Sequence, residues 1–534
     1  MTMKRLVSYV TTALAATLAG CIQNDLPYPV VEISIEAIEA EGLDGAAQIS
    51  AAQRSVTLPL LESTDIRNVH ITSVRLTEGG ASSVDFPGTF DLRTPLHTTL
   101  SLYQEYGWSI AATQHIERYF NVKKQVGAAE IDAANRTATA YVSRSTDLQQ
   151  VEVKALKLGP AEITTYSPEI VGIASFETVR LVEVAAHGRT EQWRLYVVPT
   201  DVSVRITQCD AWARIAWLSA DGLSDTEMGF RYRRKGDSEW LEVPDVAIDG
   251  GTFGARLAGL TPETEYELQA YSDEDLSDIR TFTTEAAPQL PNAGFETWST
   301  VNDILYPYAA DATDAERYWG TGNPGSMTLK KLVTTAEPAP RPGSDGAYSV
   351  RLKSQYVAFL GVGKFAAGNL FTGRYAETRG TDGVVQFGQP FASRPVALHG
   401  WVKYNRGKLD YIKGIPAGTS LSKGDPDEGM IYMALGCWTA AEYGGTDQSP
   451  VQIYTGDTKT FFDPAGKDIV AYGEAVFQSS VDEWREFTVT LDYTATDIRP
   501  THLIIVCSAS RYGDYFTGSS DSEMWVDDFE LIYE

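Results

Sequence analysis

The stretch MWVDDFEL, residues 524–531, places two adjacent aspartates inside a run that otherwise has the pattern of a buried β-strand. Alternate side chains of a strand point to opposite faces, so Asp527 would share a face with Phe529, and Val526 with Asp528. One carboxylate should therefore point toward a core, where an unpaired charge is costly. The pattern predicts a strand whose Asp527 is compensated by a cation or by a set of hydrogen-bond donors.

A second motif, NAGFETW (292–298), begins the segment that this strand ends, and Glu296 follows a core-like phenylalanine. The pairing of an N-x-G-F-E start with a D-D-apolar-x-L end resembles carbohydrate-binding jelly-roll modules, in which it brackets a structural calcium ion. Calcium takes six to eight oxygen ligands and suits exported proteins. The resemblance implies Glu296 and Asp527 as ligands, with Asp528 as a further candidate. The alternative is that Asp527 is salt-bridged or solvated at a strand end.

The segment from Pro291 to the end is rich in aromatic residues, strand-like runs and glycine-rich connections, and it has no helical period. This pattern predicts an all-β jelly-roll domain over residues 286–534. Five blocks occur in order: NAGFETW, YWGTGNPG (318–325), GKFAAGNLFTG (363–373), GQPFASRPVALHGWVKYNRG (388–407) and SRYGDYFTGSSDSEMWVDDFEL (510–531). Together they resemble the putative carbohydrate metabolism domain (PCMD) family of Bacteroidota-type lipoproteins. The resemblance implies a glycan-related role and supplies no catalytic residues.

A sugar site combines aromatic platforms with a few fixed hydrogen-bonding groups, and two glycine-containing loops offer both. The predicted ligand-binding residues are Tyr318, Trp319 and Asn323 in YWGTGNPG, and Tyr512, Asp514 and Tyr515 in RYGDYFTG. Asn369 and Arg351 are weaker polar candidates, whereas Trp298 and Trp401 lie in strand patterns and are expected in the core. For any single aromatic residue, packing in the core is the competing interpretation.

An enzyme remains an open alternative. Glycoside hydrolysis needs two carboxylates across a cleft, and Asp425, Asp427, Glu428, Asp514 and Glu523 supply carboxylates without a recognisable arrangement. A hydrolase or lyase is therefore possible in principle, and solvated loops are the simpler interpretation of these residues. A third hypothesis is an adhesin or assembly subunit that binds protein.

The N-terminus has the layout of a secretory signal: Lys4 and Arg5, an apolar run, then Leu-Ala-Gly-Cys ending at Cys21. That ending resembles the bacterial lipobox, which implies a lipoprotein signal over residues 1–21 and a lipid on Cys21. The chain is then expected to be exported and anchored to the outer membrane or cell surface, with glycan-uptake or surface-assembly proteins as further partners. A soluble secreted protein is the alternative.

Upstream of the jelly roll, residues 49–76 align without gaps on residues 131–158. The repeat predicts two immunoglobulin-like sandwiches, at 29–115 and 116–201. Residues 202–285 resemble a fibronectin type III domain, because LTPETEYELQAYS would make Tyr266 a corner tyrosine bonded to nearby backbone. The fold class is thus all-β: tandem sandwiches, acting as a stalk, followed by a jelly roll.

The net charge of −27 argues against nucleic acid, since phosphate binding needs a basic surface. The histidines and cysteines show no zinc spacing, and no cofactor other than calcium is expected. Cys437 and Cys507 could form a disulfide, although buried free thiols are favoured.

Overall fold

A computed structural model of the chain describes residues 33–51, 53–102, 104–359, 362–416 and 419–534. Cys21 and the signal-like segment lie outside the described residues. The chain divides into two compact units, residues 1–115 and 116–534. None of the helices in the described ranges has the length and apolar character needed to cross a bilayer.

The first unit and the beginning of the second repeat one strand order. In the first unit a sheet β1-β4-β6 faces a sheet β2-β3-β8-β7-β5, and residues from 116 to 200 form β9-β12-β14 and β10-β11-β16-β15-β13 in the same way. Trp108 and Trp193 are both 2% exposed in the two cores. The sequence repeat therefore corresponds to a repeat of topology. The strands are β1 (Ile35–Ala40), β2 (Gln48–Ser50), β3 (Ser55–Leu60), β4 (Val69–Leu76), β5 (Ala81–Ser82), β6 (Gly88–Phe90), β7 (Leu96–Ser101), β8 (Glu105–Gln114), β9 (Tyr119–Val122), β10 (Glu130–Asp132), β11 (Thr137–Ser143), β12 (Val151–Lys157), β13 (Thr165–Ser167), β14 (Gly172–Ala174), β15 (Arg180–Ala186) and β16 (Arg189–Thr200).

A third sandwich follows, with sheets β17-β18-β22-β21 and β20-β19-β23-β24, and β25 pairs with β23. The hydroxyl of Tyr266 accepts a hydrogen bond from the Thr261 amide at 3.0 Å, as expected for a corner tyrosine. This sandwich continues directly into the C-terminal domain. Its strands are β17 (Arg205–Ala211), β18 (Ala216–Asp221), β19 (Met228–Arg234), β20 (Leu241–Glu242), β21 (Ala247–Asp249), β22 (Thr252–Leu257), β23 (Glu265–Ser272), β24 (Asp275–Leu276) and β25 (Arg280–Thr283).

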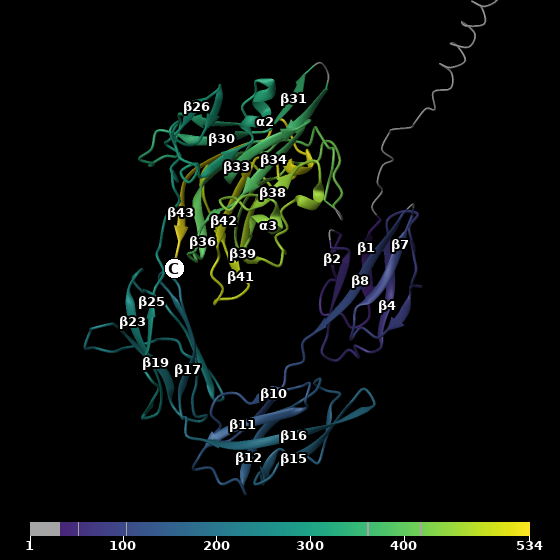
Figure 1. Cartoon of the computed structure of the whole chain (residues 1–534), viewed down its shortest axis with the longest axis vertical. Coiled ribbons are helices and arrows are strands. Elements are labelled where there is room, and N and C mark those ends of the chain that lie inside the picture. The colour runs from purple at the N-terminus through teal and green to yellow at the C-terminus, as the bar shows by residue number, and fades with distance from the viewer. Residues whose placement is uncertain (1–32, 52, 103, 360–361, 417–418) are drawn as a thin grey trace, which may run out of the picture. The chain divides into compact units, whose positions relative to one another are not determined.

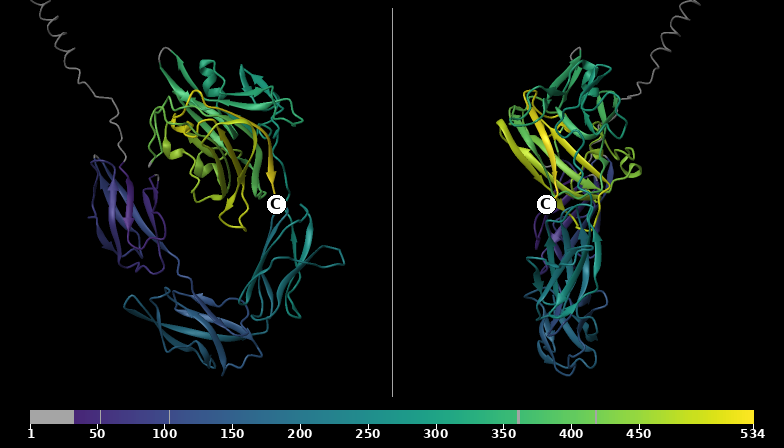
Figure 2. Two further views of the ribbon diagram at one scale, coloured as in Figure 1. Left: turned by 180° about the vertical axis from the view of Figure 1, so that it is seen from behind. Right: turned by 90° about the vertical axis from the view of Figure 1, so that its left-hand side faces the viewer.

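The C-terminal domain packs a nine-stranded sheet on a five-stranded sheet (Figure 1). The larger sheet runs β38-β34-β33-β42-β37-β39-β41 with β28 on β33 and β35 on β42; the smaller runs β29-β30-β43-β36-β40. Its elements are β26 (Ser299–Val301), β27 (Ile304–Tyr306), β28 (Trp319–Thr321), α2 (Asn323–Ser326), η1 (Met327–Leu329), β29 (Thr334–Glu337), β30 (Ser349–Lys353), β31 (Gln355–Phe359), β32 (Val362–Ala366), β33 (Asn369–Arg379), β34 (Asp382–Phe387), β35 (Gln389–Pro390), β36 (Ala397–Asn405), β37 (Gly429–Gly436), α3 (Ala440–Tyr443), β38 (Val451–Tyr454), η2 (Thr458–Thr460), β39 (Ile469–Phe477), β40 (Val481–Thr490), β41 (Asp492–Tyr493), β42 (His502–Ser508), η3 (Gly513–Tyr515) and β43 (Glu523–Ile532). Both views in Figure 2 show the last strands, in yellow, interleaved with earlier green ones.

The larger sheet is buried on both faces. One face shares the main core with the smaller sheet, and the other carries a second apolar cluster that includes Phe371, Phe387 and Tyr432. For this reason β37 and β42 read as continuous apolar runs rather than alternating ones. The second cluster forms the floor of a cavity of about 470 Å³.

Strand β43 contains a β-bulge at the two aspartates of MWVDDFEL. Its register against β36 shifts by one residue between Asp527 and Glu530, and Asp528 has a φ of 45°. A bulge lets both flanking segments keep the same face toward the core. The core side chains are Met524, Val526, Phe529 and Leu531. The prediction that Asp527 shares a face with Phe529 is therefore wrong, because strict alternation assumes an unbulged strand.

Candidate functional site

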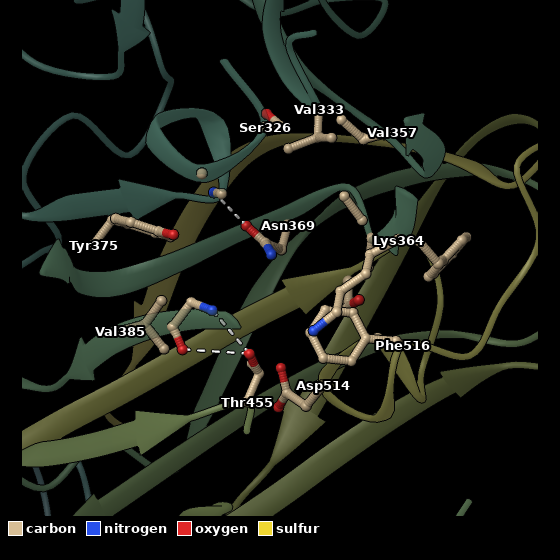
Figure 3. Close-up of a pocket in the computed structure, with 18 of the residues that line it drawn as sticks. Ser326, Val333, Val357, Lys364, Asn369, Tyr375, Val385, Thr455, Asp514 and Phe516 are labelled. Atoms are coloured by element: carbon tan, nitrogen blue, oxygen red, sulfur yellow. Dashed lines mark hydrogen bonds between the residues drawn. The ribbon is translucent and has the colours of Figure 1, made fainter. Parts of the chain in front are cut away.

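A cavity of about 470 Å³ lies on the second face of the nine-stranded sheet. Strands β33, β34, β37 and β42 make its floor, and the β31–β32 hairpin, the α2–η1 segment and η3 make its walls (Figure 3). Its lining is mainly apolar and aromatic, including Phe365, Phe371, Phe387, Val385 and Val506. A concave, largely apolar site with few polar groups is the usual form of a small-ligand site.

The two loops proposed from the sequence meet at this cavity. The first contributes Gly322 and Gly325, and the second contributes Gly513, Asp514 and Phe516. A Cβ on Gly325 would lie 2.7 Å from the Tyr375 hydroxyl, so a larger residue here would displace the Tyr375 ring. Both loops therefore border one cavity, although most of the residues that line it differ from those expected to bind a ligand.

Asp514 places a carboxylate in this apolar environment. Within the described part of the chain, no hydrogen bond or ion pair engages the carboxyl, which lines the cavity. The surrounding protein raises the pKa of the Asp514 carboxyl to about 6, although the side chain stays accessible to solvent through the cavity. An acceptor without a partner in such surroundings is a natural ligand contact.

Asn369 supplies the complementary donor. Its Oδ1 accepts a hydrogen bond from the Gly322 amide at 2.7 Å, drawn dashed in Figure 3. That bond fixes the orientation of the carboxamide, and its NH₂ group engages no partner among the described residues. Tyr432 also lines the cavity, and burial raises the pKa of its phenol well above the usual value.

The cations at the rim are already paired. Lys364 forms an ion pair with Asp382 and lies 4.2 Å from the centre of the Phe516 ring. Arg511 contacts Glu428 at 3.0 Å and Glu474 at 3.2 Å. With both cations neutralised, Asp514 leaves the cavity with a negative character.

Asp427, considered above only as a catalytic carboxylate, holds the loop that carries Asp514. It is 1% exposed, and Oδ2 accepts hydrogen bonds from Ser510 Oγ at 2.6 Å, Ser522 Oγ at 2.7 Å and the Ser519 amide at 2.9 Å. Oδ1 accepts from the Glu428 amide. Asp427 is therefore a structural anchor beneath the site and not a group that meets a ligand.

Tyr318, Trp319 and Asn323 do not present ligand-binding groups to this cavity. Trp319 is fully buried, with its ring 5.3 Å from that of Phe295, and Tyr318 is 8% exposed. The edges of both rings border only a smaller pocket of about 270 Å³. The prediction that these three residues bind a ligand is therefore replaced: all three are buried in the domain.

Asn323 has a specific structural role. Its Oδ1 accepts from the Val333 and Thr334 amides, and its Nδ2 donates to the Leu305 and Thr334 carbonyls. All of its hydrogen-bonding capacity is used, and the residue is 0% exposed. It anchors α2, which brings Gly325 and Ser326 to the cavity wall.

The remaining predicted residues lie beside the cavity. Tyr512 and Tyr515 are half-buried and do not line it, and the Tyr515 ring packs edge-on against Phe461 at 4.8 Å. Of the six predicted ligand-binding residues, Asp514 alone lines the large cavity. Arg351 pairs with Glu523 on the outer face of the smaller sheet, and Trp401 also lies there, half-buried, rather than in the core.

The predicted calcium ligands have other partners. Asp527 is 0% exposed and accepts hydrogen bonds from the Arg341 and Asp528 amides, both at 2.8 Å. Arg341 Nε contacts Asp528 Oδ2 at 2.6 Å, and Glu296 accepts from two backbone amides. Burial raises the pKa of Asp527 to about 6, with smaller contributions from Asp528 and Glu296.

This arrangement does not fit a calcium ion, since N–H groups and a guanidinium point at the oxygens that would ligate it. Across the described ranges, no group of three or more His, Cys, Asp or Glu side chains is arranged to hold a metal. Backbone donors and Arg341 therefore compensate the two aspartates. The three cysteines of the described part, Cys209, Cys437 and Cys507, are free thiols.

The sequence pattern did not predict the aromatic residues that line the cavity. Phe365, Phe371, Phe387 and Tyr432 come from four separate strands, and no local pattern shows that these strands converge. One signal was available: Asn369 and Phe371 are two residues apart in one strand and so share a face.

Comparison with protein families places this site inside a recognised domain. Residues 294–532 match the family model described as Putative carbohydrate metabolism domain. The match covers the C-terminal domain, including all of the cavity residues discussed here. A comparison with curated proteins finds no match.

Solved structures give weaker likenesses. A structure described as a putative glycoside hydrolase from Bacteroides thetaiotaomicron is 16% identical, with 78% of this chain and 96% of that chain covered and a TM-score of 0.31. Another, from Bacteroides vulgatus, is 20% identical, with 46% and 98% covered and a TM-score of 0.34. The I9–I11 tandem of titin is 9% identical, with 46% and 99% covered and a TM-score of 0.12. These values carry no conclusion about the chemistry of the site.

Proposed function

We propose that this protein is an exported, lipid-anchored protein whose C-terminal domain binds carbohydrate in the Asp514 cavity. The observation that carries the proposal is an aromatic-walled cavity with a free carboxylate, inside the segment that matches a carbohydrate metabolism domain. Aromatic rings pack against the C–H faces of sugars, while fixed polar groups select hydroxyl or amide patterns.

Binding is favoured over hydrolysis by the state of the carboxylates. Hydrolysis needs a pair of carboxyl groups facing each other across the bond. Among the described carboxylates named at and around the cavity, Asp514 engages in no ion pair or hydrogen bond, whereas Glu428 and Glu474 pair with Arg511, Asp382 pairs with Lys364, and Asp427 is buried beneath the loop. Glycan capture therefore uses the cavity as it stands, without breaking an ion pair.

Export and anchoring rest on the lipobox-like sequence at Cys21. A lipid on this residue would tether the sandwiches to a membrane and hold the C-terminal domain where polymer can reach it. Tethering also raises the effective concentration of weak sites on a multivalent glycan.

A glycan array with the full chain tests the binding proposal. We expect retention of a defined group of glycans, reduced at least tenfold by Asp514→Ala and by Phe516→Ala. Trp525→Ala, on the half-buried outer face of the smaller sheet, is the matched aromatic control and should bind as the parent does. Absence of glycan binding by a folded protein would overturn the proposal, and glycan cleavage lost with Asp514→Ala would replace it with an enzyme.

A further inference from the structure

Two polar groups that line the cavity, the Asp514 carboxyl and the Asn369 NH₂ group, engage no partner among the described residues. Asp514 offers a hydrogen-bond acceptor, and the Asn369 NH₂ group offers donors, because its oxygen is already engaged by Gly322. Figure 3 shows these two side chains on different sides of the same space. One donor and one acceptor together complement a secondary amide, which needs a partner for its carbonyl and another for its N–H.

The apolar wall suits a methyl group better than a ring of hydroxyls. Phe365, Phe371, Phe387, Val385 and Val506 all line the cavity and give it an apolar surface. A hydroxyl pressed against these side chains would lose its water without gaining a partner. A methyl substituent would instead gain the burial of its apolar surface.

Charge disfavours acidic sugars. An incoming carboxylate or sulfate would meet Asp514, and the two cations that line the cavity, Lys364 and Arg511, already pair with acidic side chains. A free amine would satisfy Asp514 but would use neither the Asn369 donors nor the apolar wall.

We propose that the cavity recognises an N-acetylated amino sugar. The acetamido N–H donates to the Asp514 carboxylate, the acetamido carbonyl accepts from Asn369 Nδ2, and the methyl group packs against the phenylalanine wall. The cavity, at about 470 Å³, is within the usual range for a small ligand. This inference rests on the proposed carbohydrate-binding function and names its ligand class.

The test uses the full chain and methyl glycosides in the glucose and galactose series, each with an acetamido, amino or hydroxyl group at C2. Titration followed by NMR should give at least tenfold tighter binding for the acetamido member of one series. Asp514→Ala and Asn369→Asp should each bring that affinity down to the level of the hydroxyl member. The aspartate at position 369 keeps an acceptor for the Gly322 amide and removes the donors, so the local fold is retained.

Each outcome decides one claim. Tighter binding of the amino member, or equal binding of the three, overturns the acetamido inference and leaves glycan binding in place. The same follows if the array retains only glycans without acetamido groups. Failure of every glycan on the array overturns the proposed function itself. Thermal melting of each variant confirms that lost binding does not reflect lost folding.

Discussion

Arg394 donates from Nε and Nη2 to a single carboxylate oxygen of Glu285, at 3.1 and 2.8 Å, and both side chains are 5% exposed. The pair lies where the third sandwich meets the C-terminal domain, since Arg394 also donates to the Ala211 carbonyl. Trp212 lies beside it, with its indole N–H donating to the Thr496 carbonyl. A buried, hydrogen-bonded ion pair of this kind joins the two domains at a fixed orientation.

Glu285→Ala should therefore destabilise the protein by about 3–5 kcal/mol, because it leaves the Arg394 charge buried without its carboxylate. Urea denaturation followed by tryptophan fluorescence measures the loss. Asp201→Ala breaks the exposed pair between Arg144 and Asp201 and should cost no more than about 1 kcal/mol. Equal losses of unfolding free energy in the two variants would show that the buried ion pair stabilises the protein no more than the exposed one.

Asp427→Ala should weaken both stability and glycan binding. It leaves two hydroxyls and two amides without their acceptor, and a buried unsatisfied group costs about 1–3 kcal/mol. Since the loop it anchors carries Asp514, the affinity measured on the array should fall as well. Asp425→Ala removes a carboxylate that accepts from the Ser422 amide in an exposed turn and should leave both properties nearly unchanged. An Asp427 variant with unaltered binding would contradict the anchoring role.

The sequence predicts the strand content and the repeat well, because both depend on local patterns that the fold preserves. The shift of 82 residues that aligns 49–76 with 131–158 also superposes β3 on β11 and β4 on β12. Strand identity follows from apolar periodicity and turn residues, which act over a few positions. The Tyr266 corner is similarly local, since its partner Thr261 is five residues away.

The site is predicted less well, because it depends on which segments meet. Trp319 and Asp514 both lie in glycine-containing loops with aromatic neighbours, yet Trp319 packs against Phe295 while Asp514 faces a cavity. The neighbouring sequence does not show which of the two residues is buried. The pairing of β28, which contains Trp319, with β33 determines that difference. The partners of Asp527 and Asp528 could not be predicted locally either, since Arg341, which donates to both carboxylates, is far away in the sequence.

Asp514 should also affect the pH dependence of stability. Its folded pKa, about 6, is above the ordinary value of about 3.9 expected in the unfolded chain. Ionisation is therefore penalised in the fold: the stabilising contribution is complete below about pH 4 and is lost as the pH rises through 6. Asp514→Ala should exceed the parent in stability at pH 7, by at most about 1 kcal/mol because solvent reaches the carboxyl.

Asp527 also has a pKa raised to about 6, but it is present in both the parent and Asp514→Ala. The difference in melting temperature between these two proteins therefore reports on Asp514. Thermal melts from pH 4 to 7.5 should show a gap that opens with increasing pH. Glycan affinity should move in the opposite sense, falling below pH 6 as the acceptor becomes protonated. A gap of constant size across the range would refute the raised pKa of Asp514 in the folded protein.

The lipid anchor gives a prediction at Cys21. Cys21→Ser removes the thiol that the lipobox would modify, so the protein should leave the membrane fraction and appear in the soluble fraction of the producing cell. Cys437→Ser, at a free thiol in the C-terminal domain, is the control and should not change the distribution. Membrane association that survives Cys21→Ser would argue against anchoring by lipid at this position.

Arg341 and calcium are competing explanations of the paired aspartates in MWVDDFEL, and one variant separates them. If the Arg341 guanidinium, which contacts Asp528 at 2.6 Å, is the cation that compensates these carboxylates, a chelator should leave the melting temperature of the parent unchanged. Arg341→Met keeps an unbranched side chain but removes the guanidinium that contacts Asp528 and lies over the Trp401 ring, and should cost about 1–2 kcal/mol. Added calcium should not restore that loss, because the backbone N–H groups that point at the oxygens of Glu296 and Asp527 remain in the variant. A parent protein that melts lower in chelator would instead establish calcium at these carboxylates, and the arginine would be a secondary contact.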